Sequence, residues 1–240
     1  MGGQYIESML RPALPARLHL PSQCEVCRDW SNAALCASCV GRFAPARPRC
    51  ARCGLAVSAP TCGECLRDPP PFEHTVCVAD YAFPWDHLIA DFKFRGRVEF
   101  AGALAPLLLA AVRAAAGPAC QLVLPVPLAP GRLAERGYNQ AWELARRVAA
   151  GLGLLASSGL LLRPIDTPPQ AELGRSARRD NLRSAFMVDP RQREAVRGLR
   201  VALVDDVMTT GATARAATAV LLRAGAAAVD VWVLARTPAD

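Results

Sequence analysis

Paired cysteines constrain the fold of this chain more than any other feature of its sequence. Eight of its ten cysteines form four C-x-x-C pairs, which repeat as two copies of the spacing C-x2-C-x8-C-x2-C. The pairs are Cys24/Cys27, Cys36/Cys39, Cys50/Cys53 and Cys62/Cys65. Two residues between cysteines let both thiolates turn toward one tetrahedral Zn²⁺. Four cysteines around each ion leave no open coordination position, so the spacing predicts two structural zinc ribbons without hydrolytic chemistry.

The sequence leaves open how the pairs are shared between the two zinc ions. Two neighbouring pairs per ion is the simplest arrangement, but crossed pairing is compatible with the same spacing. Disulfide or redox roles are less favoured, because four disulfides have little use in the cytosol. The other two cysteines, Cys77 and Cys120, lie in apolar, strand-like stretches and are expected to be small buried hydrophobic residues.

Charge and hydropathy exclude several other classes of protein. The longest apolar run, residues 104–112, contains a proline and is too short to cross a bilayer. We see no signal peptide at the N-terminus, so we expect a cytoplasmic protein without membrane insertion. The formal net charge of +7 suggests an anionic partner. Eight zinc-bound thiolates and two Zn²⁺ would lower this charge to about +3, which weakens an argument for nucleic acid from charge alone.

The order of apolar segments indicates the domain organisation. We expect an N-terminal extension at 1–20, the zinc ribbons at 21–68 and, after a proline-rich linker, an α/β domain at 72–240. The expected strands are 74–81, 122–126, 160–162, 201–204 and 229–234, and the expected helices are 84–95, 98–116, 138–152 and 213–224. This alternation predicts a largely parallel sheet with right-handed crossovers.

The most informative stretch runs from Val201 to Thr213, where a buried strand leads into two adjacent acids, a Thr/Gly-rich turn and a helix. Open parallel sheets bind ligands at the carboxyl ends of their strands, and free N–H groups at a helix start bind phosphate. Asp205 and Asp206 would accept hydrogen bonds from a sugar diol. Alternatively they only cap the turn, although that explains one acid and not both.

The ten residues from Val204 to Thr213 resemble the phosphoribosyl pyrophosphate (PRPP) signature of the type I phosphoribosyltransferases. With the paired cysteines, they make roughly residues 20–237 resemble the ComF family of competence proteins. The resemblance implies a type I phosphoribosyltransferase-like sheet flanked by helices, with an N-terminal double zinc ribbon. It implies that Asp205 and Asp206 bind the ribose hydroxyls in catalysis. The 5′-phosphate would be bound by Thr209, Thr210, Gly211, Ala212 and Thr213.

Two further segments and the only lysine, Lys93, resemble motifs of the same family. The pyrophosphate loop would include Val126, Pro127, Leu128, Arg132, Arg136, Asn139 and Gln140. The flexible loop would include Thr167, Gln170, Arg178 and Asn181. Lys93 would contact a phosphate. Each assignment has a simpler alternative: solvated charge for the arginines, helix capping for Asn139 and Gln140, an exposed basic helix for the flexible loop, and surface solubility for Lys93.

The resemblance implies transfer or binding of a phosphoribosyl group from PRPP, or a related phosphorylated sugar or nucleotide, with Mg²⁺. No residue pattern identifies an acceptor, so enzyme activity stays open. The second hypothesis is a non-enzymatic, PRPP- or nucleotide-responsive protein in DNA uptake that contacts single-stranded DNA or the competence machinery. Against it, aromatic residues for base stacking make up only 6% of the chain. The scattered histidines, His19, His74 and His87, are expected to have structural or surface roles.

Overall fold

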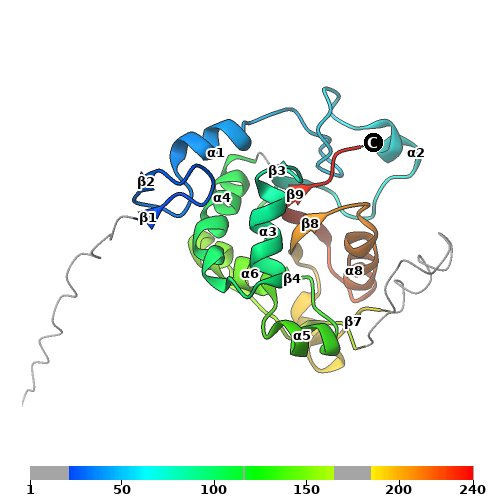
Figure 1. The fold of residues 1–240 in the computed structure, drawn as a ribbon. Coiled ribbons are helices and arrows are strands. Elements are labelled where there is room, and N and C mark those ends of the chain that lie inside the picture. The colour runs from blue at the N-terminus through cyan, green and yellow to red at the C-terminus, as the bar shows by residue number, and fades with distance from the viewer. Residues whose placement is uncertain (1–21, 116, 165–184, 240) are drawn as a thin grey trace, which may run out of the picture.

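Five parallel strands form the centre of the molecule, in the order β3-β9-β8-β4-β5 (Figure 1). The computed structural model describes residues 22–115, 117–164 and 185–239. The strands are β3 (Thr75–Asp80), β4 (Leu122–Pro125), β5 (Leu155–Ala156), β8 (Arg200–Met208) and β9 (Ala228–Arg236). Each neighbouring pair is parallel, which confirms the predicted α/β fold.

Helices cover both faces of the sheet, so its central strands are apolar almost throughout. One face packs against α3 (Trp85–Phe94), α4 (Ala101–Ala114) and α6 (Gln140–Leu152), with the short 3-10 helix η1 (Val98–Phe100) before α4. The other face packs against α8 (Ala212–Arg223). Along β8, Ala202 and Val204 point to the first face, and Val201 and Leu203 to the second, as the two-residue period of a strand requires.

Several elements differ from the sequence-based expectation. Strand β8 continues through both acids to Met208, because its pairing with β9 extends to Met208 opposite Arg236. The strand expected at 160–162 lies outside the central sheet: β6 (Leu161–Leu162) pairs antiparallel with β7 (Met187–Val188). Two helices were not expected, α5 (Pro130–Arg136) and the 3-10 helix η3 (Pro190–Val196). Both have proline near the start, where its missing N–H costs nothing.

The two copies of the cysteine repeat have the same local structure. In each, the first C-x-x-C pair lies in a turn and the second lies at the start of a short helix. These helices are α1 (Ala37–Phe43), capped by Cys36, and α2 (Gly63–Arg67), which follows Cys62. A small hairpin of β1 (Ser22–Gln23) and β2 (Trp30–Ser31) encloses the first turn. Among the described residues, the search for a helix long and apolar enough to cross a bilayer finds none.

Candidate functional site

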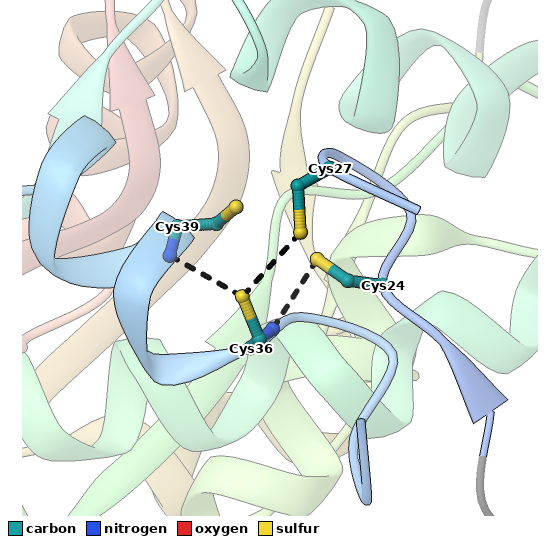
Figure 2. A group of neighbouring side chains, drawn as sticks. All are labelled: Cys24, Cys27, Cys36 and Cys39. Carbon is teal, nitrogen blue, oxygen red and sulfur yellow. Dashed lines mark hydrogen bonds between the residues drawn. The ribbon is translucent and has the colours of Figure 1, made fainter. Parts of the chain in front are cut away.

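The first cysteine group consists of Cys24, Cys27, Cys36 and Cys39 (Figure 2). Its four sulfur atoms all lie within 4.8 Å of one another. Cys27 Sγ and Cys36 Sγ are 3.8 Å apart, and a tetrahedron with Zn–S bonds of about 2.3 Å has an edge of about 3.8 Å. All ten cysteines, which all lie in the described residues, are free thiols. The geometry therefore fits a four-cysteine zinc site rather than disulfides.

The second cysteine group consists of Cys50, Cys53, Cys62 and Cys65, again within 4.8 Å of one another. Each group thus joins two pairs that are neighbours in the sequence, and this settles the pairing as sequential. Equivalent backbone N–H groups donate to equivalent sulfurs in the two copies: Cys36 N to Cys24 Sγ at 3.4 Å, and Cys62 N to Cys50 Sγ at 3.3 Å.

These backbone hydrogen bonds favour the deprotonated form of one sulfur in each group. Burial alone would raise the pKa of the Cys24 thiol, but N–H groups of Cys36, Cys27 and Val26 lower it to about 6. The same balance lowers the pKa of Cys50 to about 7. The thiolate is the form that binds metal. Both donor sets are therefore compatible with structural zinc.

Asp206 lies at the carboxyl end of β8 and is almost completely buried, with 1% of its surface exposed. Lys93 Nζ donates a hydrogen bond to Asp206 Oδ1 at 3.2 Å and lies 3.0 Å from Oδ2 as an ion pair. Within the described part of the chain, no hydrogen bond of good geometry reaches Oδ2. A buried carboxylate oxygen with a free acceptor position calls for a donor from a ligand or water.

Asp205 is partly buried beside it, and its Oδ1 accepts a hydrogen bond from Asp206 N at 2.8 Å. Burial and the negative charge of Asp206 raise the pKa of Asp205 well above its usual value, while the nearby Lys93 ammonium acts in the opposite direction. Two adjacent carboxylates held in this way repel each other when both are ionised. Hydroxyl donors or a cation from a ligand would relieve that repulsion.

The α8 turn, residues 209–213, directly follows the end of β8 at Met208. Gly211 precedes α8 with φ of 77°, a left-handed conformation that favours glycine. Gly211 has no side chain that could cap the helix, and within the described residues the side-chain acceptor at its start is Thr210 Oγ1, 3.4 Å from Ala212 N. Thr209 and Thr210 are exposed. The first N–H groups of α8 therefore point to a surface with hydroxyls nearby, an arrangement that suits an anion.

The predicted pyrophosphate loop begins beside the acid pair, because Val126 N donates to Val204 O at 2.8 Å. Asn139 has the capping role: its Oδ1 accepts from Ala141 N and Trp142 N, and its Nδ2 donates to Val126 O at 3.0 Å. Arg132 and Arg136 belong to α5 rather than to a loop. Gln140 is buried and accepts a hydrogen bond from Arg136.

The expected flexible-loop residues Thr167, Gln170, Arg178 and Asn181 lie outside the described residues. Their roles stay predictions, as do the roles assigned to Pro127 and Leu128 in the expected pyrophosphate loop. The structure does bring Lys93, from α3, into contact with Asp206, from β8. The predicted phosphate contact of Lys93 is untested, but its proximity to the acid pair places it at the same end of the sheet.

Comparison with known proteins identifies the family of the chain. It is 38% identical over 229 residues to DNA utilization protein YhgH of Salmonella typhi, a match that covers 92% of this chain and 99% of that protein. It is 35% identical over 208 residues to competence protein F of Haemophilus influenzae, covering 84% of this chain and 90% of that protein. The chain belongs to the ComF family.

Solved structures resemble the ComF-family chain only distantly. Adenine phosphoribosyltransferase from Leishmania tarentolae shares 19% identity over 55% of this chain and 54% of that chain, with a TM-score of 0.34. A search against family models finds no match. The parallel sheet order and the two cysteine groups, rather than this overlap, define the fold of the ComF-family chain.

A second polar cluster lies at the opposite, amino-terminal edge of the ComF-family sheet. His74, for which a structural or surface role was expected, contacts Asp230 there, with Nδ1 3.2 Å from Oδ1. Arg200 pairs with Asp230 at 3.2 Å and with Glu73 at 2.6 Å, so one guanidinium serves both carboxylates. A cavity of about 390 Å³ adjoins it, lined by His74, Cys120 and Asp230 among mainly apolar residues. The residues lining this cavity do not include the acid pair.

Proposed function

We propose that this ComF-family chain binds PRPP, or a related phosphorylated sugar or nucleotide, together with Mg²⁺ at the carboxyl end of β8. The observation that carries the proposal is Asp206 Oδ2, a buried carboxylate oxygen beside the exposed start of α8. It pairs with the Lys93 ammonium at 3.0 Å but accepts no hydrogen bond of good geometry from the described residues. The PRPP-like sequence from Val204 to Thr213 supports the same ligand, because it combines a diol acceptor with a phosphate site.

In this proposal different residues of the protein bind different parts of the ligand. Asp205 and Asp206 accept hydrogen bonds from the ribose hydroxyls, and the N–H groups of the α8 turn hold the 5′-phosphate. Lys93 balances the charge of Asp206 and would contact the pyrophosphate. Arg132 and Arg136, on α5, add positive charge on the side of β4. When bound with PRPP, Mg²⁺ would supply Lewis-acid stabilisation of the pyrophosphate leaving group.

A role in DNA uptake is the second candidate, and the relatives named DNA utilization protein and competence protein support it. A specific observation favours contact with single-stranded DNA. The ring of Phe94 is 69% exposed next to the proposed site. Arg136 Cζ lies 5.1 Å and Lys93 Nζ 5.8 Å from its centroid. An exposed ring beside cations can stack on a base while the cations contact phosphate.

Calorimetry with Mg²⁺ and PRPP tests the first proposal. A hydrogen bond to a charged group contributes about 1.5–3 kcal/mol. We therefore expect Asp205→Asn or Asp206→Asn to lower affinity by about 10- to 100-fold, and the double change to abolish binding. Asp86→Asn, at the start of α3, is the control and should bind as the unchanged protein does. Equal affinity in all variants would remove the site assignment.

Two measurements separate an enzyme from a binding protein. Pyrophosphate release on adding candidate bases or amines would indicate transfer, whereas PRPP binding without release would indicate a sensor.

Binding of a single-stranded oligonucleotide tests the role of Phe94 in DNA contact. Phe94→Leu should weaken this binding about 10-fold. Phe83→Leu, which removes a ring that is 60% exposed and contacts Phe43, should not weaken it. Identical affinities would exclude Phe94 as a stacking platform.

A further inference from the structure

Arg236, the last residue of β9, connects the second cysteine group to the α8 turn. The residue is buried, with 8% of its surface exposed. Its Nε donates a hydrogen bond to the Cys53 carbonyl oxygen at 3.0 Å. Its Nη1 donates to the carbonyl oxygens of Met208 at 3.2 Å, of Thr237 at 2.8 Å, and of Thr209. One guanidinium therefore contacts a cysteine of the metal group and the residues that lead into the turn.

These contacts fix the two segments relative to each other. Arginine stays charged inside a protein and presents its donors in one rigid plane. A buried donor that loses its acceptor is costly, so the carbonyl groups of Cys53, Met208 and Thr209 are held around a single charge. Thr237 N also donates to Met208 O at 3.0 Å, which fastens the chain after β9 to the same point.

The position of Cys53 depends in turn on the second cysteine group. The apolar residues of this group form only a small cluster of their own, in which Leu55 and Val57 pack against the cysteines. A segment with so little core takes its folding energy from the metal. Loss of the metal would therefore free Cys53, remove one acceptor from Arg236 and open the guanidinium to water.

We propose that Arg236 is a positioning residue that links metal occupancy of the second cysteine group to the geometry of the α8 turn. The proposal rests on the proposed function for its ligand, since the turn is where the 5′-phosphate would bind. Its consequence is mutual: metal at the second group favours binding of the phosphorylated sugar, and the bound sugar favours retention of that metal. The first cysteine group makes its contacts elsewhere, through Trp85 with Phe43 O and through Arg97 with Glu25.

The structural link can be measured without any ligand, by amide hydrogen exchange. Cys65→Ser removes a ligand of the second group, and Cys39→Ser removes the equivalent ligand of the first. We expect Cys65→Ser to speed exchange at Thr237 and in peptides covering 205–213 by about 5-fold or more. Cys39→Ser should leave those amides unchanged. Equal exchange in the two variants would overturn the proposal, whatever PRPP does.

The linkage to ligand is measured as the rate of zinc release to a chromogenic chelator, with and without PRPP and excess Mg²⁺. Coupling between sites typically changes affinities by about 5- to 150-fold. We expect PRPP to slow release of one of the two zinc ions by about 5-fold or more, and Cys65→Ser to lose that protected ion. Protection of both ions, or of the ion at the first group, would overturn the proposal.

Substitutions at two arginines separate this link from simple loosening of the second group. Arg236→Met should bind PRPP about 10-fold more weakly and lose the protection of zinc, and Arg236→Lys should restore part of it. Arg49→Met is the matched control, because Arg49 joins Gly54 O and Asp80 to each other without contacting the α8 turn. It should speed zinc release but keep the protective effect of PRPP. Loss of protection in Arg49→Met but not in Arg236→Met would contradict the proposal.

The outcomes distinguish a failure of this link from a failure of the proposed function. If hydrogen exchange responds to the second group but PRPP does not bind, the link stands and the proposed ligand is wrong. If PRPP binds but neither exchange nor zinc release responds as described, the ligand stands and the link is wrong.

Discussion

The two cysteine groups share one sequence spacing and one local geometry, yet they attach to the sheet by different forces. The first group packs apolar side chains onto the main core: Leu35 is buried there, and Val40 and Phe43 pack against it. The second group attaches through polar contacts to the sheet strands. Thr75 N donates to Ala51 O at 2.9 Å, and Thr75 Oγ1 donates to Arg52 O at 2.6 Å. Figure 1 shows α1 next to α4, and α2 on the opposite side of the molecule.

The repeated motif therefore determines how each group binds metal, while the residues around the motif determine how the group docks onto the sheet. Apolar packing is non-directional and tolerates small shifts of the group. Hydrogen bonds fix distance and angle. The second group is therefore the one whose position can be transmitted to the carboxyl ends of the strands, where the acid pair lies.

Metal loss should have the largest effect on both cysteine groups. Structural zinc contributes about 10–16 kcal/mol of apparent folding energy in small zinc domains, so each group should unfold locally without its ion. Elemental analysis should find two zinc ions per chain. Cys24→Ser and Cys50→Ser should each leave one, because the two groups do not share ligands. One zinc or none in the unchanged protein would refute the paired sites, and loss of both from a single change would refute their independence.

The mode of docking predicts an intermediate effect. Leu35 is a member of the main core, and removal of a buried leucine side chain costs about 2–5 kcal/mol. Leu35→Ala should therefore lower the free energy of unfolding of the sheet by an amount toward the lower end of that range, measured in urea. Val57→Ala is the matched change in the second group. It should leave the unfolding of the sheet nearly unchanged, because Val57 packs against the small cluster of the second group and belongs to neither of the clusters that cover the sheet. Equal losses would mean that both groups share the core.

Residues close together in the sequence were the ones whose arrangement could be predicted. The cysteine spacing predicted two four-cysteine groups, and Gly211 between a buried strand and a helix predicted the strand–turn–helix unit. The exact end of β8 could not be predicted, since aspartates disfavour strands locally. Pairing with the equally long β9 overrides that preference and keeps Asp205 inside the strand.

Contacts between distant segments could not be predicted from the sequence. Lys93 and Asp206 are separated by 113 positions, and Arg236 and Cys53 by 183. Their meeting depends on the order of strands in the sheet and on the docking of the second group. A charged residue at the end of an apolar strand was the only hint of Arg236. Lys93 stands out as the only lysine of the chain, but nothing near it in the sequence indicates Asp206 as its partner.

A weak effect is expected from the ion pair between Arg97 and Glu25, which reinforces the docking of the first group. Arg97 Nη2 lies 2.8 Å from Glu25 Oε1, and its hydrogen bond lowers the pKa of Glu25 despite partial burial. Pairs of this exposure contribute up to about 1 kcal/mol. Because the folded-state pKa of Glu25 is lowered, this stability is present above the unfolded value of about 4.3 and is lost as pH falls through the folded value.

Arg97→Met should therefore reduce stability in urea at pH 7 in low salt, and less so in high salt, where the pair is screened. Below the folded pKa of Glu25 the variant and the unchanged protein should converge. Arg28→Met is the control, because Arg28 is a more exposed partner of the same Glu25 carboxylate at 3.1 Å. It should reduce stability less than Arg97→Met does. An equal or larger reduction would show that Arg97 does not hold the first group in place.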